Sequence, residues 1–301
     1  MKNRKEGKGR KEGKEKGKGI VDFLLIAFFF AGVLILLYPN FSNIWNQYRS
    51  NLLMTEYEDG VARLSSDERE QIWKAAQEYN ASHTTNVVAD AFTEETDVLN
   101  QEYEKLLNPE GNGIMGSIMI PSIDVNLPIY HGTGEEELKR GCGHLQGTSL
   151  PIGGSGTHAV LAAHRGLPSA KLFTDLDRLE CKDIFYLTIM DKKLAYEIDQ
   201  IKTVLPEKTE ELDIVDGEDC ITLITCTPYG VNTHRLLVRG HRIPYEEADG
   251  LEHEGRIRTG LLRQAVILLI ILLIAILVIV GICSKTRSRR KRKIRRKRNV
   301  R

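Results

Sequence analysis

Residues 220–230 read Cys-Ile-Thr-Leu-Ile-Thr-Cys-Thr-Pro-Tyr-Gly. The first seven residues are rich in β-branched side chains, which predicts a strand, and the Pro and Gly that follow end it. Cys226 is therefore expected at the carboxyl end of a strand, next to the loop that follows, rather than in the middle of the core. The next β-rich segment begins near Arg235. If the two segments pair as a hairpin, Cys226 and Arg235 face each other at the foot of its loop.

Similar short segments continue the pattern on both sides of this stretch, from residue 111 onward. Gly and Pro separate them, and only brief helical signals lie between. Several short strands at this density predict a closed or nearly closed β-barrel, so the fold class is mainly β. The candidate strands are residues 116–120, 125–129, 158–163, 184–189, 193–204, 220–226 and 235–243.

Residues 41–107, before the barrel, read as mainly helical. Ser65 and Glu68 form an S-x-x-E capping box, and apolar residues follow at helical spacing. A second, short helix is predicted for residues 93–107. Residues 81–92 have no periodicity and are expected to form a loop.

Two apolar runs, residues 20–38 and 264–283, divide the chain into segments of opposite charge. Each is about as long as the ~20 residues that a helix needs to cross a bilayer. Residues 1–19 carry a net charge of +6 and residues 284–301 one of +12, whereas the remainder carries −17. Under the positive-inside tendency, both basic tails lie in the cytoplasm and the acidic segment lies outside.

Other interpretations of these segments are weaker. A cleaved signal peptide could explain the first run, but no small-x-small cleavage pattern follows it. A buried core helix would show a polar stripe, which both runs lack. Basic tails occur in nucleic-acid-binding proteins, but tails that adjoin apolar runs are explained by membrane insertion and anionic lipids, so no nucleic-acid partner is expected.

The predicted organisation has seven segments. They are a cytoplasmic basic tail (1–19), a transmembrane helix (20–38), an extracytoplasmic helical region (39–110), a β-barrel catalytic domain (111–245), a linker (246–263), a second transmembrane helix (264–283) and a second cytoplasmic basic tail (284–301). The five cysteines are widely spaced and form no C-x-x-C pair, which argues against a disulfide scaffold and a structural zinc site.

Cys226 is the cysteine best placed for chemistry. A nearby fixed cation such as Arg235 favours the thiolate and can also stabilise an oxyanion. A nucleophilic thiol needs a proton acceptor, and His164 lies at a strand-to-loop junction. From the residues alone, a core cysteine and a structural histidine remain open readings. The competing histidines are His131, His144 and His234.

Three separated motifs carry a resemblance to a known family. Residues 222–240 resemble the TLxTC…R signature of sortases, particularly of class C, the pilin-polymerising enzymes of Gram-positive bacteria. Residues 158–173 are similar to the family's histidine segment, and residues 113–133 resemble its first barrel strands. The similarity covers roughly residues 41–245 and extends to the two anchors. The family usually has Gly before the histidine, where this chain has Ala163, which is also small.

The resemblance implies a membrane-anchored, extracytoplasmic cysteine transpeptidase with a sortase-like closed barrel. Cys226 would attack the Thr–Gly bond of a Leu-Pro-x-Thr-Gly-like sorting signal, with His164 as acid and base and Arg235 beside the oxyanion. The thioester would then pass to a pilin lysine. The implied partners are pilins or surface proteins that bear sorting signals, and membrane lipids. A monomer without metal or cofactor is expected.

The resemblance also implies a lid. Class C enzymes have a loop with Asp-Pro-Trp/Phe in the active site, and the matching residues here are Asp90-Ala91-Phe92. Asp90 would pair with Arg235, and Phe92 would cover Cys226. The missing Pro leaves this loop less rigid, because Pro would fix φ. An ordinary loop with one anchoring Phe is the alternative.

Three other functions remain as alternatives. A sortase that anchors proteins to the cell wall would use a peptidoglycan amine as acceptor, but the second anchor and the lid residues argue against it. A catalytically silent membrane binding protein would not need the complete set of Cys226, His164 and Arg235. A plain cysteine protease would require water to outcompete the amine.

Overall fold

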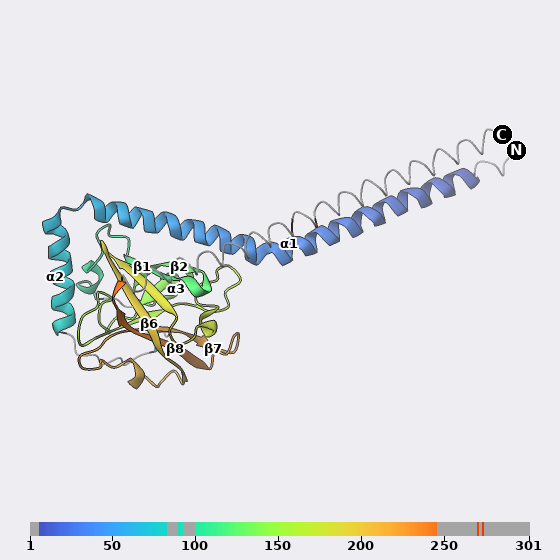
Figure 1. The fold of residues 1–301 in the computed structure, drawn as a ribbon. Coiled ribbons are helices and arrows are strands. Elements are labelled where there is room, and N and C mark those ends of the chain that lie inside the picture. The colour runs from blue at the N-terminus through green and yellow to red at the C-terminus, as the bar shows by residue number, and fades with distance from the viewer. Residues whose placement is uncertain (1–5, 83–89, 93–99, 246–269, 271–272, 274–301) are drawn as a thin grey trace. The chain divides into compact units, whose positions relative to one another are not determined.

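The computed structural model describes residues 6–82, 90–92 and 100–245, with residues 270 and 273. The described chain begins with two α-helices, which lead into a closed barrel (Figure 1). The helices and strands are α1 (Glu6–Arg63), α2 (Ser66–Ser82), η2 (Tyr103–Lys105), β1 (Ile114–Ile120), η3 (Pro121–Ile123), β2 (Val125–His131), α3 (Glu135–Arg140), β3 (Cys142–His144), β4 (Thr157–Ala162), η4 (Leu176–Arg178), β5 (Ile184–Ile189), β6 (Lys192–Val204), η5 (Glu210–Leu212), β7 (Asp219–Thr227) and β8 (His234–Ile243).

The barrel closes in the strand order β1-β2-β3-β4-β7-β8-β6-β5. Strands β2 and β3 pair in parallel, as do β4 and β7, and the other neighbours are antiparallel. Parallel pairing aligns the carboxyl ends of β4 and β7 at one end of the barrel, with Ala162 opposite Ile224. The residues that follow each strand therefore meet there.

The side chains of β7 point alternately to the two faces of the strand and so enter two different hydrophobic clusters. Ile221 and Leu223 belong to the main core, whereas Ile224 packs outside it with Ala162 of β4 and Leu237 of β8. Since side chains alternate between the faces of a strand, Cys226 shares the outer face with Ile224. The outer face of β4, β7 and β8 therefore carries the candidate nucleophile.

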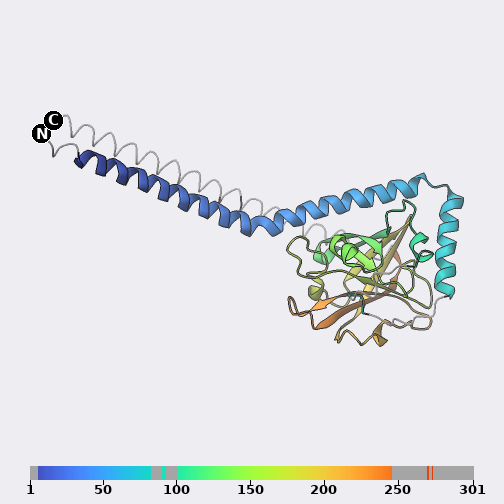
Figure 2. The same cartoon turned by 180° about the vertical axis from the view of Figure 1, so that it is seen from behind.

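The N-terminal helices pack on the barrel. The C-terminal part of α1 runs beside β2 in both views (Figure 1 and Figure 2). The hydroxyl of Tyr57 in α1 donates to the Met115 carbonyl at 2.7 Å and accepts from the Met190 amide at 3.0 Å. The predicted capping box is present at the start of α2, where the Glu68 amide donates to the Ser65 hydroxyl and the Glu68 carboxylate accepts from the Ser65 amide.

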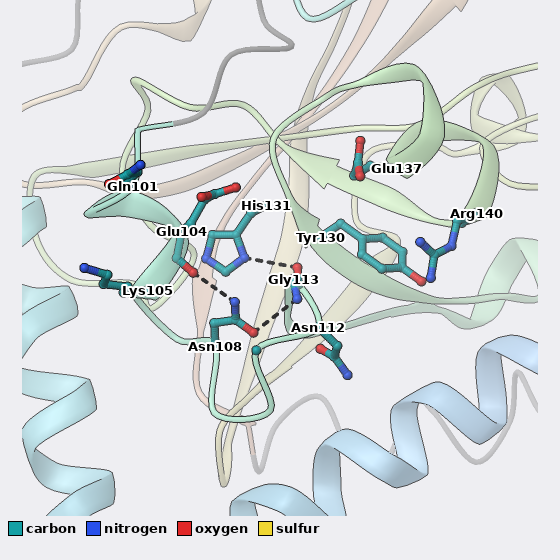
Figure 3. Close-up of a pocket in the computed structure, with 11 residues that line it drawn as sticks. Gln101, Glu104, Lys105, Asn108, Asn112, Gly113, Tyr130, His131, Glu137 and Arg140 are labelled. Atoms are coloured by element: carbon teal, nitrogen blue, oxygen red, sulfur yellow. Dashed lines mark hydrogen bonds between the residues drawn. The ribbon is translucent and has the colours of Figure 1, made fainter.

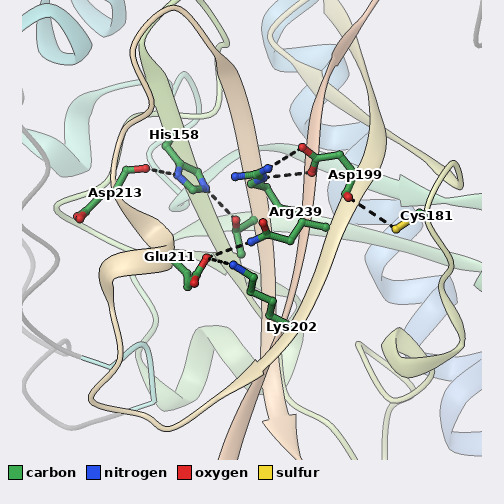
Figure 4. A network of polar contacts seen from close by, with 9 residues as sticks. His158, Cys181, Asp199, Lys202, Glu211, Asp213 and Arg239 are labelled. Atoms are coloured by element: carbon green, nitrogen blue, oxygen red, sulfur yellow. Dashed lines mark hydrogen bonds and ion pairs between the residues drawn. The ribbon is translucent and has the colours of Figure 1, made fainter.

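The segment between β6 and β7 is fastened to the barrel by a polar network (Figure 4). The buried ring of His158 on β4 lies 2.8 Å from the Asp213 carbonyl and 2.8 Å from the Thr222 hydroxyl on β7. Nearby, Arg239 forms two hydrogen bonds with Asp199. The pair of Arg239 and Asp199 joins β8 to β6, whereas the His158 contact with Asp213 and the hydrogen bond from Lys202 to Glu211 at 2.7 Å hold the segment between β6 and β7 against the barrel.

All seven predicted strands occur, with boundaries that differ by at most two residues. The sequence did not predict β3 or α3. The helix predicted for residues 93–107 is wrong for its described part, 100–107, which contains only the turn η2. The reason is tertiary: Tyr103 is buried, and its hydroxyl lies 2.7 Å from His144 Nδ1, so this segment follows its contacts rather than helix propensity.

The predicted membrane spans are untested. Within the described residues, no helix combines the length and the hydropathy that crossing a bilayer requires. Residues 20–38 lie in α1. Residues 264–283 lie outside the described residues, except for 270 and 273. Both spans remain predictions.

Candidate active site

Cys226 and Arg235 lie directly opposite each other in the β7–β8 ladder. Both are buried, each with a relative exposure of 8%. The turn between the strands is closed by the Val231 and Asn232 amides, which both donate to the Pro228 carbonyl. This register is the one expected of a hairpin with Cys226 at its foot.

His164 follows β4 by two residues and lies at the same end of the barrel. Its segment is tied to β7, because the Ala163 amide donates to the Ile224 carbonyl and the Thr225 hydroxyl donates to the Ala163 carbonyl at 2.8 Å. The structure thus places His164, which follows β4, at the same end of the barrel as Cys226 on β7 and Arg235 on β8, and these three strands are neighbours.

Asp90 pairs with Arg235 through both carboxylate oxygens. Arg235 Nε donates to Oδ1 at 2.8 Å, and Nη2 donates to Oδ2 at 2.5 Å. The two side chains are 7% and 10% exposed, so the pair is largely shielded from solvent. A bidentate, charge-assisted pair of this kind is among the stronger polar contacts in proteins.

The ring of Phe92 contacts both His164 and Arg235. Its ring centroid lies 5.9 Å from that of His164, and the Arg235 guanidinium lies over the same ring at 5.1 Å. Both contacts are within the range of aromatic and cation–π attraction. We call residues 90–92 the lid.

The lid fills the outer groove above β7. Ala91 is 1% exposed and packs with Leu212, Ile224 and Leu237. The cavity left between the lid, η5 and the strands has a volume of 10 Å³. A cavity of about 10–15 Å³ on this measure holds a single water molecule, so no space for a peptide remains between Ala91, η5 and the strands.

The pKa values of Cys226 and His164 are shifted in opposite directions. Burial raises the pKa of the Cys226 thiol, Arg235 opposes the rise, and Asp90 adds to it. Burial lowers the pKa of His164, whereas Glu135 raises it and Lys139 lowers it. Under the closed lid, a neutral thiol and a neutral imidazole are therefore favoured over a thiolate and an imidazolium.

Helix α3 contributes charges that sequence reasoning missed. Glu135 and Lys139, which pair at 2.8 Å, both act on His164. Three acidic residues in the first turn and two basic residues in the last suit the helix dipole, and this pattern could have predicted α3.

Arg165 connects the segment after His164 with the segment after Cys226. Its Nη1 lies 3.4 Å from the Thr227 hydroxyl, Cζ lies 5.9 Å from the Tyr229 ring centroid, and Nη2 pairs with Asp177. Its Nε is buried and has no hydrogen-bond partner among the described residues. Sequence reasoning also missed this contact, because Arg165 and Thr227 are far apart along the chain.

The competing histidines have other positions. His144 is fully buried and contacts Tyr103 and the Ser149 carbonyl. His234 begins β8 and contacts Thr233. The ring of His131 lies 3.0 Å from the Gly113 carbonyl and 2.7 Å from the Leu106 carbonyl. Both its nitrogens are thus engaged away from Cys226.

His131 lines a separate polar cavity of 490 Å³ (Figure 3). Lys105 and Asn108 lie on one side of it, and α3 contributes Glu137 and Arg140. None of the described residues that line it is a cysteine, and it shares no described lining residue with the Cys226 site. Among the described residues, no group of three or more His, Cys, Asp or Glu side chains is arranged to hold a metal ion.

Comparison with known proteins identifies the family. A family model described as the sortase domain matches residues 118–243. The crystal structure of sortase C-1 from Streptococcus pneumoniae is 46% identical, with a TM-score of 0.61, and the match covers 64% of this chain and 99% of that one. The chain belongs to the sortase family of cysteine transpeptidases.

The resemblance found in the sequence is thus confirmed, and other relatives agree. The structure of a pilus-related sortase C of Group B Streptococcus is 43% identical to this sortase over 64% of its chain and 98% of the other, with a TM-score of 0.60. Sortase A of Streptococcus agalactiae serotype III is 35% identical over 128 residues, which is 42% of this chain and 51% of that protein. The chain spans about half to two thirds of the length of the curated relatives it matches.

Proposed function

We propose that this sortase joins pilins through a thioester on Cys226. The Cys226 thiolate attacks the Thr carbonyl carbon of a Leu-Pro-x-Thr-Gly-like signal, and Arg235 stabilises the oxyanion. The Thr–Gly bond breaks as His164 gives its proton to the departing Gly amine. A lysine amine of the next pilin then attacks the thioester, His164 takes up a proton, and the thiolate is released.

The main support for this proposal is that Cys226, Arg235 and His164 all lie at the same end of the barrel. Cys226 faces Arg235 in the β7–β8 ladder, and His164 follows the adjacent strand β4. Arg235 already holds two carboxylate oxygens of Asp90 with its Nε and Nη2 donors. The same donors suit an oxyanion once the lid leaves.

The lid supports the pilin-joining assignment over cell-wall anchoring. The Asp90–Arg235 pair and the Phe92 contacts fit the lid expected of class C enzymes, and solved structures similar to this chain include sortases C. We assign the barrel to the outer side of the cell membrane, with residues 20–38 and 264–283 as anchors. The two apolar runs and their basic flanks support this location.

An acceptor competition tests the proposed substrate. The full chain in detergent, with Asp90→Ala to open the lid, receives a Leu-Pro-x-Thr-Gly peptide and equal amounts of a lysine-bearing peptide and triglycine. Mass spectrometry measures both products. We expect mainly the product linked through the lysine side chain. Mainly the triglycine product would favour cell-wall anchoring, and mainly the hydrolysed peptide would favour a protease.

A further inference from the structure

The loop that carries His164 is fixed at both ends. The Phe173 amide donates to the His164 carbonyl at 3.1 Å, and the Gly166 amide donates to the Thr174 hydroxyl at 3.1 Å. Leu172 and Phe173 are buried in the main core. At the tip of the loop, residues 169–171, Ala170 is buried in the same core and Lys171 Nζ donates to the Ile123 carbonyl at 2.6 Å, but the Ser169 carbonyl and the Lys171 amide need further partners.

Helix α1 holds this tip. Ser42 Oγ donates to the Ser169 carbonyl at 2.7 Å, and Asn46 Nδ2 donates to the same oxygen. Asn43 Oδ1 accepts from the Lys171 amide at 3.1 Å. Three side chains on one turn of α1 thus bind the backbone of a loop more than 120 residues away in the sequence. We call Ser42, Asn43 and Asn46 the α1 clamp.

The α1 clamp lies on the same face of α1 as the residues that pack on the barrel. Asn46 is followed at helical spacing by the buried residues Ser50, Met54, Tyr57 and Val61. Ser and Asn are poor helix formers, so three of them within five residues are not explained by the helix itself. They are explained by the loop, because its backbone groups need hydrogen-bond partners.

We propose that the α1 clamp positions His164 by fixing its loop, which couples the helix that carries the first predicted anchor to the acid–base residue. This inference rests on the proposed role of His164. Residue 38, the end of the predicted span, lies four residues before Ser42. With the clamp intact, the anchor helix and the His164 loop move as one body. Without it, the loop tip loses three hydrogen bonds and keeps, within the described residues, only the core contact of Ala170 and the contacts of Lys171 with Ile123, Thr174 and Asp175, so His164 samples more positions unsuited to proton transfer.

The test uses the full chain in detergent in the Asp90→Ala background, so that lid opening does not limit the rate. The triple variant S42A/N43A/N46A removes the clamp, and Ala does not weaken the helix, since it has the highest helix propensity. Thr55→Ala is the matched control, because within the described part of the chain the Thr55 hydroxyl bonds only the Asn51 carbonyl of α1. Measured are kcat and KM for the sorting-signal peptide, the thermal midpoint, and hydrogen exchange of residues 164–173.

We expect kcat to fall by about 3- to 10-fold in the triple variant, with KM and the thermal midpoint unchanged. Exchange should become faster in residues 164–173 and stay unchanged in β7. Thr55→Ala should match the parent. Unchanged exchange in the loop, or a loss of kcat that follows a lower thermal midpoint, would overturn the proposal. If the parent forms no thioester, the proposed function fails, but the exchange measurement still decides whether the clamp holds the loop.

Discussion

Asp90→Ala should accelerate acylation of Cys226 by about 10- to 100-fold, because it removes the bidentate contact that holds the lid on Arg235. The pair as a whole is taken to contribute about 1.5–3 kcal/mol, the range for one hydrogen bond to a charged group, because both groups are hydrated once the lid opens, and 1.4 kcal/mol corresponds to tenfold in a population. Phe92→Ala should give a smaller increase, because its ring contacts are weaker. Stopped-flow measurement of thioester formation with the sorting-signal peptide gives these rates.

The same substitution should shift the pH dependence of thiol alkylation. Burial and Asp90 raise the pKa of Cys226, so opening the lid lowers it. The thiolate fraction at a given pH then increases, and the alkylation profile moves to lower pH. Iodoacetamide labelling, followed by mass spectrometry of the Cys226 peptide between pH 6 and 10, measures the shift.

Asp199→Ala is the matched control for the lid substitution. Asp199 of β6 forms a comparable two-bond pair with Arg239, which lies four residues after Arg235 on β8. This variant should leave both the acylation rate and the alkylation profile of Cys226 unchanged. If Asp90→Ala and Asp199→Ala behaved alike, residues 90–92 would not act as a lid.

His164→Gln should lower the acylation rate by about 10²- to 10⁴-fold, since Gln keeps a polar side chain but cannot transfer a proton. The peptide KM should change much less, because His164 acts on the leaving amine rather than on binding. His234→Gln, at the start of β8, should retain most of the activity. The opposite order of the two variants would assign the acid–base role to His234.

The sequence predicted the strands well because their pattern is local. Alternation and the flanking Gly and Pro place each strand, and the β7–β8 hairpin fixes Cys226 opposite Arg235 without any long-range knowledge. The position of His164 at the end of a strand followed from the same pattern. The parallel pairing of β4 with β7, which brings His164 to the end of the barrel that holds Cys226, was not predicted; only the resemblance to sortases implied that the two residues share a site.

Other features depend on tertiary contacts that no local pattern encodes. Tyr103 draws residues 100–107 out of a helix, and β3 has only three residues, too few for a periodic signal. The clamp on the His164 loop and the contact of Arg165 with Thr227 join segments that are remote in the sequence. Such contacts require the closed barrel before they can be recognised.

The most direct test of the account is mass spectrometry of the intact chain after incubation with a Leu-Pro-x-Thr-Gly peptide, beside a Cys226→Ala control. Asp90→Ala is present in both proteins to open the lid. The account predicts an adduct with the mass of the peptide up to its Thr, mapped to Cys226, labile to hydroxylamine and absent from the control. An adduct on another cysteine, or none in a protein whose Cys226 reacts with iodoacetamide, would contradict it.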